Sequence, residues 1–458
     1  MVAGSTSTAA PTGDLVALER ATLRAVRMRL LPFLFLLYIV AWLDRVNVAF
    51  AALQMNRDLH LTPAIYGFAA GVLSIGYALF EVPSTLVLFR VGARKWIARI
   101  MITWGVLSAA TMFVQGPHSL YVMRFLLGVA EAGFFPGMIF YLGCWFPAAE
   151  RARTLAWFLA AIPLSSVVGG PLAGLILGLH GQLGLRGWQW LFLIEGIPSV
   201  LLGAVVLRWL PDTPSQARWL SSESAAWLTD KLRREQTDTH HRHALDLRKA
   251  LSHPAVWQLG LIYFCGSAAS YGLTLWVPQI VKGLSGSSDL AVGFLSALPY
   301  VAGGLATLLV AARSDRTGER CLYVGAAHIV AVLGFIASAM SHSPVLGILS
   351  LTVAAIGTFG RNGPFWALPS TFLSGSAAAG GIALINTLGA LGGFSGPYII
   401  GLVKGQTGSY AGGLGVVAAL LLVSSAMVVR LRSTPVLAPV ARDSVTAGGL
   451  PDHFVPKS

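Results

Sequence analysis

The stretch LLPFLFLLYIVAWLDRVNVAF, residues 30–50, decides the fold class of this chain. It begins as an apolar run of the kind that crosses a lipid bilayer as a helix, yet Asp44, Arg45 and Asn47 lie within its last two turns. A charged side chain at the centre of a spanning helix costs roughly 2.5–3.5 kcal/mol on insertion scales. Two adjacent charges in such a helix therefore need a physical explanation.

The composition of the whole chain agrees with this interpretation. Of its 458 residues, 55% are hydrophobic and only 11% are charged, and the mean hydropathy is +0.70. Soluble domains carry about 25% charged residues, so these values favour a protein that crosses the membrane many times. The net charge of +13 would indicate nucleic-acid binding if it formed one basic face. The basic residues instead lie between apolar segments, and we expect no nucleic-acid partner.

Twelve segments are long and apolar enough to span a bilayer, which takes about 20 residues of helix. They are residues 29–50, 65–89, 97–115, 120–144, 155–179, 189–210, 256–281, 290–312, 321–340, 344–368, 377–402 and 412–431. The fold class predicted is therefore an all-α membrane protein with twelve transmembrane helices.

One long polar link, residues 211–253, divides these segments into six and six. We expect two six-helix halves, residues 28–210 and 254–433. The ends of the chain, residues 1–27 and 434–458, are rich in Ala, Thr, Ser, Pro and Gly and are predicted to be disordered tails.

The distribution of Lys and Arg predicts the orientation in the membrane. With the N-terminus in the cytoplasm, nearly all basic residues of the links fall on the cytoplasmic side, as the positive-inside rule requires. The opposite side holds only Arg57, Arg186, Lys282 and Lys404. Both tails and the central link are therefore expected in the cytoplasm.

The central link contains His240, His241 and His243, which could be considered as metal ligands. No Cys or carboxylate accompanies them at the spacing of a metal site. We interpret them as part of a solvated linker and expect no metal.

Once the charges of the links are set aside, seven charged residues remain inside the predicted spans. They are Asp44, Arg45, Glu81, Arg124, Glu131, Glu195 and Arg361. Such groups usually face the interior of a helix bundle and mark ion or substrate paths. For Glu81 and Glu195, a buried pair that fixes helix packing is an equally good explanation. The four charges of the first and fourth spans are too costly for packing alone, because small residues already serve that purpose.

Carboxylates beside arginines in a gated, partly wet cavity suit proton-coupled transport. The proton affinity of a carboxylate depends on its burial and on nearby cations, so access to water can decide its protonation. Arginine stays charged and binds a carboxylate through two parallel hydrogen bonds. Gly- and Pro-rich stretches such as GVAEAGFFPG (128–137) and LGALGGFSGP (388–397) indicate the broken or closely packed helices of transporters.

Two other functional classes are disfavoured by the sequence. A membrane-embedded enzyme or a sensor would need a nucleophile elbow, an HExxH motif or a large soluble domain, and the sequence has none of these. A channel would carry a filter sequence or pore-lining rings, which are also missing from the sequence.

Several motifs carry a resemblance to a known family. Twelve spans with a central link resemble the major facilitator superfamily. DRVN (44–47), RFLLGVAEAGFFPG (124–137) and WFPAAERAR (145–153) look like signatures of its anion:cation symporter family. The segment 363–397, beginning GPFWALPSTF, is similar to the bacterial organic-anion branch, and the resemblance covers about residues 30–433.

This resemblance implies two pseudo-symmetric halves that import a carboxylate with protons by alternating access. It implies that Asp44 and Glu131 are the protonatable pair, that Arg45 holds the substrate carboxylate, and that Arg124 partners the acid on the first span.

Further roles are implied by position in the motifs. Tyr77, Trp366 and Asn386 fall where sugar-acid transporters contact their substrate. Asp315 and Arg316 belong to SDRTGER (314–320), which resembles the gating motif of the superfamily.

The substrate class remains open between several carboxylates. Trp42 and Ile162 replace residues that are polar in sugar-acid transporters, which disfavours a sugar acid. Arg361, one turn before Phe365 and Trp366, could bind a second carboxylate, or it could be a packing cation paired locally. We therefore favour a tartrate-like hydroxy-dicarboxylate.

The alternatives are an aromatic acid of the phthalate or hydroxyphenylacetate type and a sugar acid. An aromatic acid would use a predicted aromatic lining of Phe134, Phe135, Phe365 and Trp366. The protein is expected to be a monomer of the bacterial inner membrane that needs no cofactor beyond a proton gradient.

Overall fold

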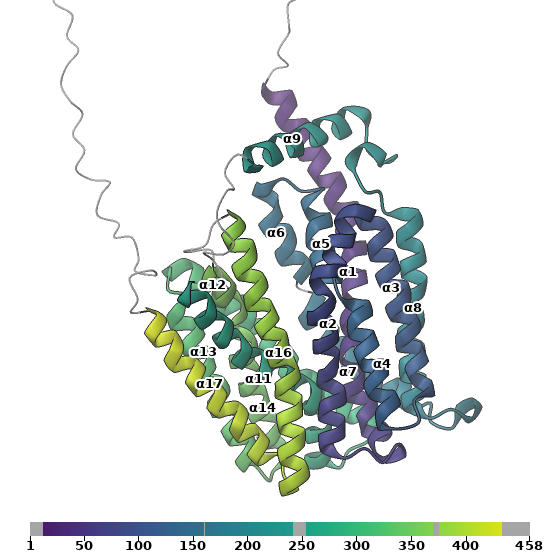
Figure 1. Ribbon diagram of the computed structural model, residues 1–458, viewed down its shortest axis with the longest axis vertical. Helices are drawn as coiled ribbons and strands as arrows, with labels where there is room; N and C mark the ends of the chain where they lie inside the picture. Colours follow the sequence, from purple (N-terminus) through teal and green to yellow (C-terminus); the bar gives the residue numbers. More distant parts are fainter. Residues whose placement is uncertain (1–11, 160, 241–252, 370–374, 433–458) are drawn as a thin grey trace, which may run out of the picture.

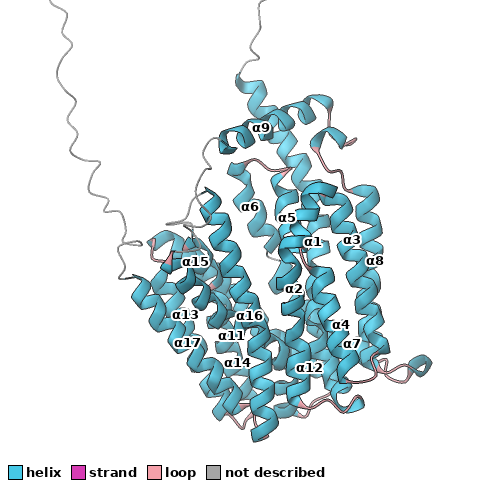
Figure 2. Ribbon diagram, in the orientation of Figure 1, coloured by secondary structure: helices cyan, strands magenta, loops and turns pink. Residues whose placement is uncertain are grey.

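The computed structural model describes residues 12–159, 161–240, 253–369 and 375–432, and within these ranges it contains only helices and their connections (Figures 1 and 2). Twelve of the described helical segments are long and apolar enough to cross a membrane. The predicted fold class is confirmed, and the segments predicted from hydropathy correspond one by one to these helices.

The helices form two groups of six spans, some of which are broken into two helices. The first group contains α1 (Thr12–Asp58), α2 (Pro63–Val91), α3 (Ala93–Ala110), α4 (Pro117–Glu131), α5 (Phe134–Gly143), α6 (Ala148–Leu159), α7 (Ala161–Leu177) and α8 (Gly187–Trp209). The second contains α11 (Pro254–Ser285), α12 (Asp289–Thr317), α13 (Cys321–Met340), α14 (Pro344–Gly360), α15 (Asn362–Ala367), α16 (Gly375–Thr407) and α17 (Ala411–Arg432). Between the groups lies α9 (Ser222–His240), and single 3-10 turns occur at η1 (Thr111–Phe113), η2 (Gln182–Gly184) and η3 (Pro214–Gln216).

The fourth span is interrupted between α4 and α5. Gly133 has φ +85°, and the hydroxyl of Ser84 occupies the space in which a Cβ atom would lie. That hydroxyl donates a hydrogen bond of 2.5 Å to the carbonyl of Ala132. The break therefore leaves Glu131 at the end of α4 with the neighbouring backbone satisfied inside the protein, as irregular backbone at membrane depth must be.

The tenth span is also divided into two helices, α14 and α15, although its backbone stays right-handed at the junction. Arg361 lies at the junction, and the carbonyl of Phe359 accepts a 3.0 Å hydrogen bond from the hydroxyl of Thr307. The fourth and tenth spans occupy equivalent places in the two halves. Each half therefore places one intramembrane charge, Glu131 or Arg361, at a helix break.

The predicted N-terminal tail is wrong for residues 12–27, because α1 begins at Thr12 and continues through them as helix. The reason is a contact with α9. Val26 and Leu228 are both fully buried, and the hydroxyl of Thr22 donates a 2.8 Å hydrogen bond to that of Ser224. A helix extension that buries one face against a second helix does not stay disordered.

The helix α9 within the central link was also not predicted. Ser221 caps the start of this helix, because its hydroxyl accepts a hydrogen bond from the backbone N–H of Ser224. An ion pair of 3.4 Å joins Lys231 of α9 to Glu19 of α1. A second ion pair, of 2.6 Å, joins Arg27 of α1 to Glu150 of α6. The predicted tail 434–458 lies outside the described residues, as do His241 and His243.

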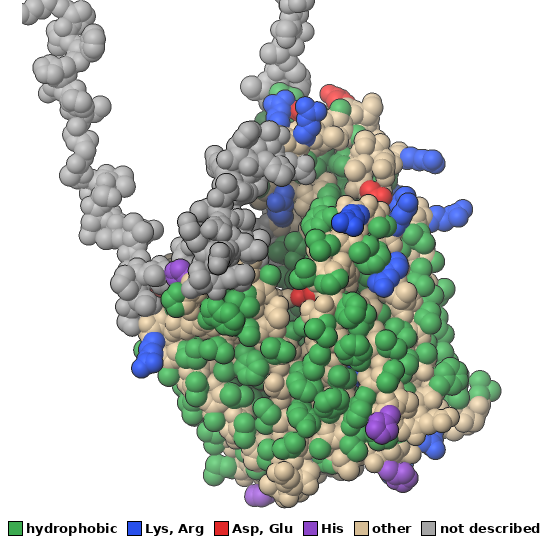
Figure 3. Space-filling view, viewed as in Figure 1, with side chains coloured by type: hydrophobic (Ala, Val, Ile, Leu, Met, Phe, Trp, Pro, Cys, Tyr) green, Lys and Arg blue, Asp and Glu red, His purple; other side chains and the backbone are tan. Residues whose placement is uncertain are grey.

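The two halves contact each other at the end of the molecule opposite α9. Hydrogen bonds from Gln54 to Asp289 (2.8 Å) and from Asn56 to Gln279 (3.0 Å) join them there. The backbones of α7 and α12 approach so closely at Gly170 that it has no room for a Cβ atom. Toward α9 the halves diverge (Figure 1), and Figure 3 shows a hollow between them with acidic side-chain atoms beside it. The conformation is open toward α9 and closed at the other end.

We predict that Leu228→Ala will loosen the contact between α9 and α1. Replacing a buried Leu by Ala costs about 2–5 kcal/mol because methyl groups lose their burial and leave a cavity. Limited proteolysis of the purified protein should then cut within α9 faster than in the native protein. The matched control is Thr229→Ala, because the exposed Thr229 hydroxyl bonds only the Ala225 carbonyl of its own helix. Equal cleavage of both variants would contradict the packing argument.

Candidate functional site

The carboxylate of Asp44 lies fully buried at the centre of the first half. Three hydrogen bonds of 2.6 Å reach it, from the indole N–H of Trp104 and the hydroxyls of Ser108 and Ser199. The amide of Asn47 adds a weaker bond of 3.4 Å. Four uncharged donors from α1, α3 and α8 thus surround this carboxylate. Donors at such distances compensate much of the cost of removing a carboxylate from water.

Glu131 and Arg45 form an ion pair between α4 and α1. The Nε and Nη2 atoms of Arg45 donate to the same oxygen, Oε2 of Glu131, at 3.0 and 2.7 Å. Oε1 of Glu131 has no hydrogen-bond partner. The guanidinium also lies 4.9 Å from the ring centre of Tyr77 and 3.5 Å from the hydroxyl of Tyr271. Arg45, one fifth exposed, is the more accessible member of the pair.

The predicted partnership of Arg124 with Asp44 is wrong for this conformation. Asp44 is held by neutral donors, and no salt bridge to Arg124 occurs among the described residues. The side chain of Arg124 is 1% exposed, and its Nε and Nη1 atoms find no hydrogen-bond partner in the described part of the chain. It lies two turns before Glu131 on the same face of α4. A buried guanidinium with unused donors is a costly arrangement that an anion would relieve.

Arg361 is a second buried guanidinium with unused donors, in the other half. It is 2% exposed, and its Nε and Nη1 have no hydrogen-bond partner among the residues that the structure describes. Its guanidinium lies 5.2 Å from the ring centre of Tyr263 and 5.8 Å from that of Phe365, and it packs directly on Gly266. The alternative of a locally paired cation finds no support, since no described acid lies within salt-bridge distance of Arg361.

Asn386, on α16, makes its contact across the interface between the halves. Its amide donates to both carboxylate oxygens of Glu81 on α2, at 3.0 and 3.1 Å. Trp366 lies elsewhere, 37% exposed and edge-on to the ring of Tyr263 at 4.9 Å. Glu81 is thus paired across the interface, and this contact joins a helix of one half to a helix of the other.

Asp315 and Arg316 lie apart from this charge cluster, whereas Glu195 lies beside it. Asp315 is bonded to Arg320 at 2.5 Å at the end of α12, and Arg316 beside it is exposed. Glu195 is buried one turn before Ser199 on α8, so it faces the neighbourhood of Asp44.

The predicted aromatic lining is largely buried in the packing of the protein. Phe134 is 4% exposed and packs edge-on to Trp104 at 5.0 Å, and Phe365 is fully buried and stacks on Tyr263. Of the four predicted lining residues, only Phe135 and Trp366 keep accessible surface. This weakens the argument for an aromatic substrate.

Sequence reasoning missed the neutral donors around Asp44. A signal was present, because Trp104 and Ser108 are four residues apart in the third span and therefore lie on one helix face. Ser199 on the sixth span carries no comparable signal, since a lone serine in a spanning helix usually bonds its own backbone.

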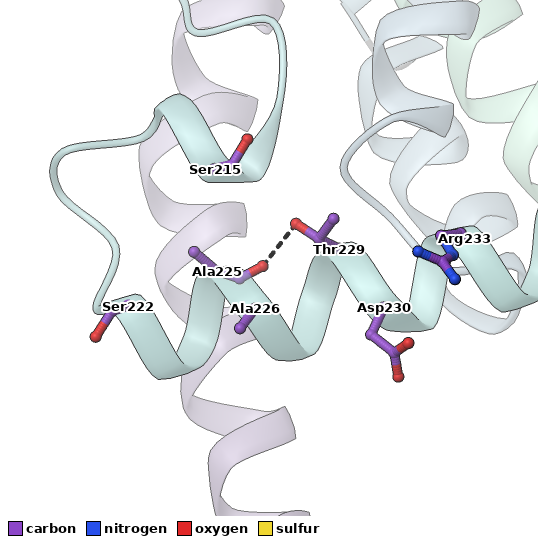
Figure 4. Close-up of a pocket in the computed structure, with 7 residues that line it drawn as sticks. All are labelled: Ser215, Ser222, Ala225, Ala226, Thr229, Asp230 and Arg233. Atoms are coloured by element: carbon purple, nitrogen blue, oxygen red, sulfur yellow. Dashed lines mark hydrogen bonds between the residues drawn. The ribbon is translucent and has the colours of Figure 1, made fainter.

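A surface depression near α9 is unrelated to this cluster (Figure 4). Its lining consists of Ser215, Ser222, Ala225, Ala226, Thr229, Asp230 and Arg233. Most of these side chains are small or exposed, and the hydroxyl of Thr229 donates a hydrogen bond to the Ala225 carbonyl. No buried polar group points into it, and we assign it no function.

The chain resembles known transporters over most of its length. It is 48% and 49% identical to two Agrobacterium vitis proteins, each named "Putative tartrate transporter", over 91% of this chain and 93% and 96% of theirs. It is 43% identical to the "Quinolone resistance transporter" of Acinetobacter baumannii, over 86% of this chain and 91% of that protein.

Solved structures share the fold at low sequence identity. A bacterial homologue of the human lysosomal transporter Spinster, in an inward-facing and occupied conformation, superimposes with a TM-score of 0.73 at 17% identity, covering 88% of this chain and 96% of that one. The xylose transporter XylE of E. coli, partially occluded and inward open, gives a TM-score of 0.68 at 15% identity over 88% and 98% of the two chains. Residues 34–397 match the family described as Major Facilitator Superfamily. With twelve spans in two halves and relatives that share nearly half of its residues, this chain belongs to the major facilitator superfamily of membrane transporters.

Proposed function

We propose that the protein imports a small organic anion together with protons, by alternating access, and that the anion is a tartrate-like hydroxy-dicarboxylate. The observation that carries this proposal is the pair of buried guanidinium groups with unused donors, Arg124 in one half and Arg361 in the other. A dicarboxylate offers one anionic group to each half. The names of the two Agrobacterium relatives support the same substrate class.

Arg45 and Arg124 would hold the first carboxylate, with Tyr77 supporting the guanidinium of Arg45. In this structure Glu131 is paired with Arg45. Protonation of Glu131 would remove its charge, release Arg45 for the substrate, and so couple the proton to the anion.

Asp44 would be the second proton site, because its uncharged donors can solvate the carboxylate but leave its charge without a cation. Arg361, with Trp366 and Asn386 nearby in the second half, would hold the second carboxylate.

The orientation in the membrane, the gating contacts and the oligomeric state are part of the same proposal. The open end beside α9 faces the cytoplasm, as the distribution of Lys and Arg requires, and the membrane is the bacterial inner membrane. Asp315 and Arg316, at the cytoplasmic end of α12, would contact the first half when that end closes. We propose a monomer that needs no cofactor, with the proton gradient as its energy source.

An aromatic acid is the second candidate substrate. It is favoured by the accessible ring of Trp366 beside Tyr263 and by the relative named for quinolone resistance. Both candidates need a carboxylate at Arg45, and they differ in the group presented to Arg361.

Counterflow in proteoliposomes tests the function directly. Vesicles loaded with unlabelled tartrate should take up labelled tartrate from outside, because exchange needs only a binding site that is alternately accessible. Phthalate and gluconate serve as competitors from the two alternative classes. An absence of exchange with every organic acid tested would refute the proposal that this protein transports organic anions.

We predict that Glu131→Gln will separate exchange from accumulation. Gln cannot gain or lose a proton, so tartrate exchange should persist while uptake driven by an imposed pH gradient falls to background. Glu150→Gln is the matched control, since Glu150 pairs with Arg27 outside the site. Normal pH-driven accumulation by the Glu131 variant would exclude it as a coupling site.

We predict that Arg361→Ala will weaken dicarboxylate binding selectively. A hydrogen-bonded charged pair contributes roughly 1.5–3 kcal/mol, which corresponds to about a ten- to hundredfold higher Kd for tartrate. A monocarboxylate such as glycerate should lose little affinity. Arg361→Lys, which keeps the charge without the planar donor pair, should give an intermediate value. Equal losses for both acids would show that Arg361 acts through folding or packing.

A further inference from the structure

Glu81 is an intramembrane acid to which the proposed transport cycle gives no role. It lies on α2, one turn after Tyr77, whose ring supports the guanidinium of Arg45. Its two carboxylate oxygens both accept from the amide of Asn386 on α16. The carboxylate of Glu81, in the first half, is thus hydrogen-bonded to the amide of Asn386, in the second half, at the interface between them.

The position of this bond along the interface is informative. Between described residues, the hydrogen bonds joining the halves include Gln54 to Asp289 and Asn56 to Gln279 at the closed end. The bond between Glu81 and Asn386 lies on the side of the open hollow, because α2 runs from the closed end at Pro63 toward α9. Toward α9, the helices α2 and α16 diverge (Figure 1). The contact is therefore reached from the hollow through which a substrate enters or leaves.

Asn386 also belongs to the surroundings of the unpaired Arg361. Gly389, one turn further along the same face of α16, packs directly against the ring of Tyr263. That ring lies beneath the guanidinium of Arg361. Asn386 thus lies one helical turn from a residue that contacts this ring, and this connects the amide held by Glu81 to the neighbourhood of Arg361.

We propose that Glu81 is a specificity-determining residue that acts as a tethered competitor for the Asn386 amide. This inference rests on the proposed function of organic-anion transport. A substrate carboxylate has the same acceptor chemistry as Glu81 and displaces it from Asn386, whereas the single carboxylate of a monocarboxylate is used at Arg45. Displacement also breaks a bond between the halves, so binding at this position releases a contact that moves during alternating access.

The test is equilibrium binding of tartrate and glycerate to the full-length protein in nanodiscs. Glu81→Gln keeps the size of the side chain but replaces a charged acceptor by a neutral one, which holds an amide about half as strongly. It should lower the Kd for tartrate about fivefold or more, with a smaller change for glycerate. Asn386→Ala should weaken tartrate binding, and in the double variant the gain from Glu81→Gln should vanish.

Three controls make the outcomes distinct. Asp230→Asn removes a surface carboxylate that pairs with Arg234 on α9, and it should leave both affinities unchanged. If Glu81→Gln does not fold, Glu81→Met removes the charge at similar volume and makes the same prediction. Failure of the wild-type protein to bind any organic acid would refute the proposed function. Wild-type binding together with unchanged or weaker tartrate binding in the Glu81 variants, or a gain that persists without Asn386, would overturn the competitor role alone.

Discussion

The rest of the structure depends on how the buried carboxylate of Asp44 is stabilised by hydrogen bonds from the protein itself. Asp44 accepts three 2.6 Å hydrogen bonds from α3 and α8, and these bonds fix α1 against both helices. Because neutral donors solvate this acid, no arginine is used to neutralise it. Arg45 is paired with Glu131, and Arg124 keeps unused donors in the middle of the same half. An excess of unsatisfied cationic donors is what an anion-binding site in a membrane requires.

The two halves place different buried charges at equivalent helix breaks. The break between α4 and α5 ends a helix at Glu131, and the break between α14 and α15 places Arg361 at the corresponding junction. The first half thus holds acids and arginines together, which suits proton exchange and anion binding at one place. The second half holds an arginine on aromatic rings with no described acid in contact. Closing the halves around a substrate would bring these complementary sets together.

Much of the fold was predictable from sequence, because twelve apolar segments and the positions of Lys and Arg depend only on local composition. The site was predictable as a set of charged residues, but its pairing was not. The family resemblance implied that Arg124 partners Asp44, whereas the donors that surround Asp44 are Trp104, Ser108 and Ser199, from helices whose relative placement is a tertiary property. The helical start of α1 was missed for the same reason, since its partner α9 lies some 200 residues later.

The central claim is that the buried charges bind an anion and a proton in one cycle. The most direct measurement records the internal pH of proteoliposomes, loaded with a fluorescent pH indicator, when tartrate is added outside without an imposed pH gradient. The account predicts that the lumen becomes more acidic in step with tartrate uptake, and that a protonophore, with potassium and valinomycin to balance the charge, abolishes the pH change while uptake continues. Tartrate uptake with no change of internal pH in the absence of the protonophore would contradict it.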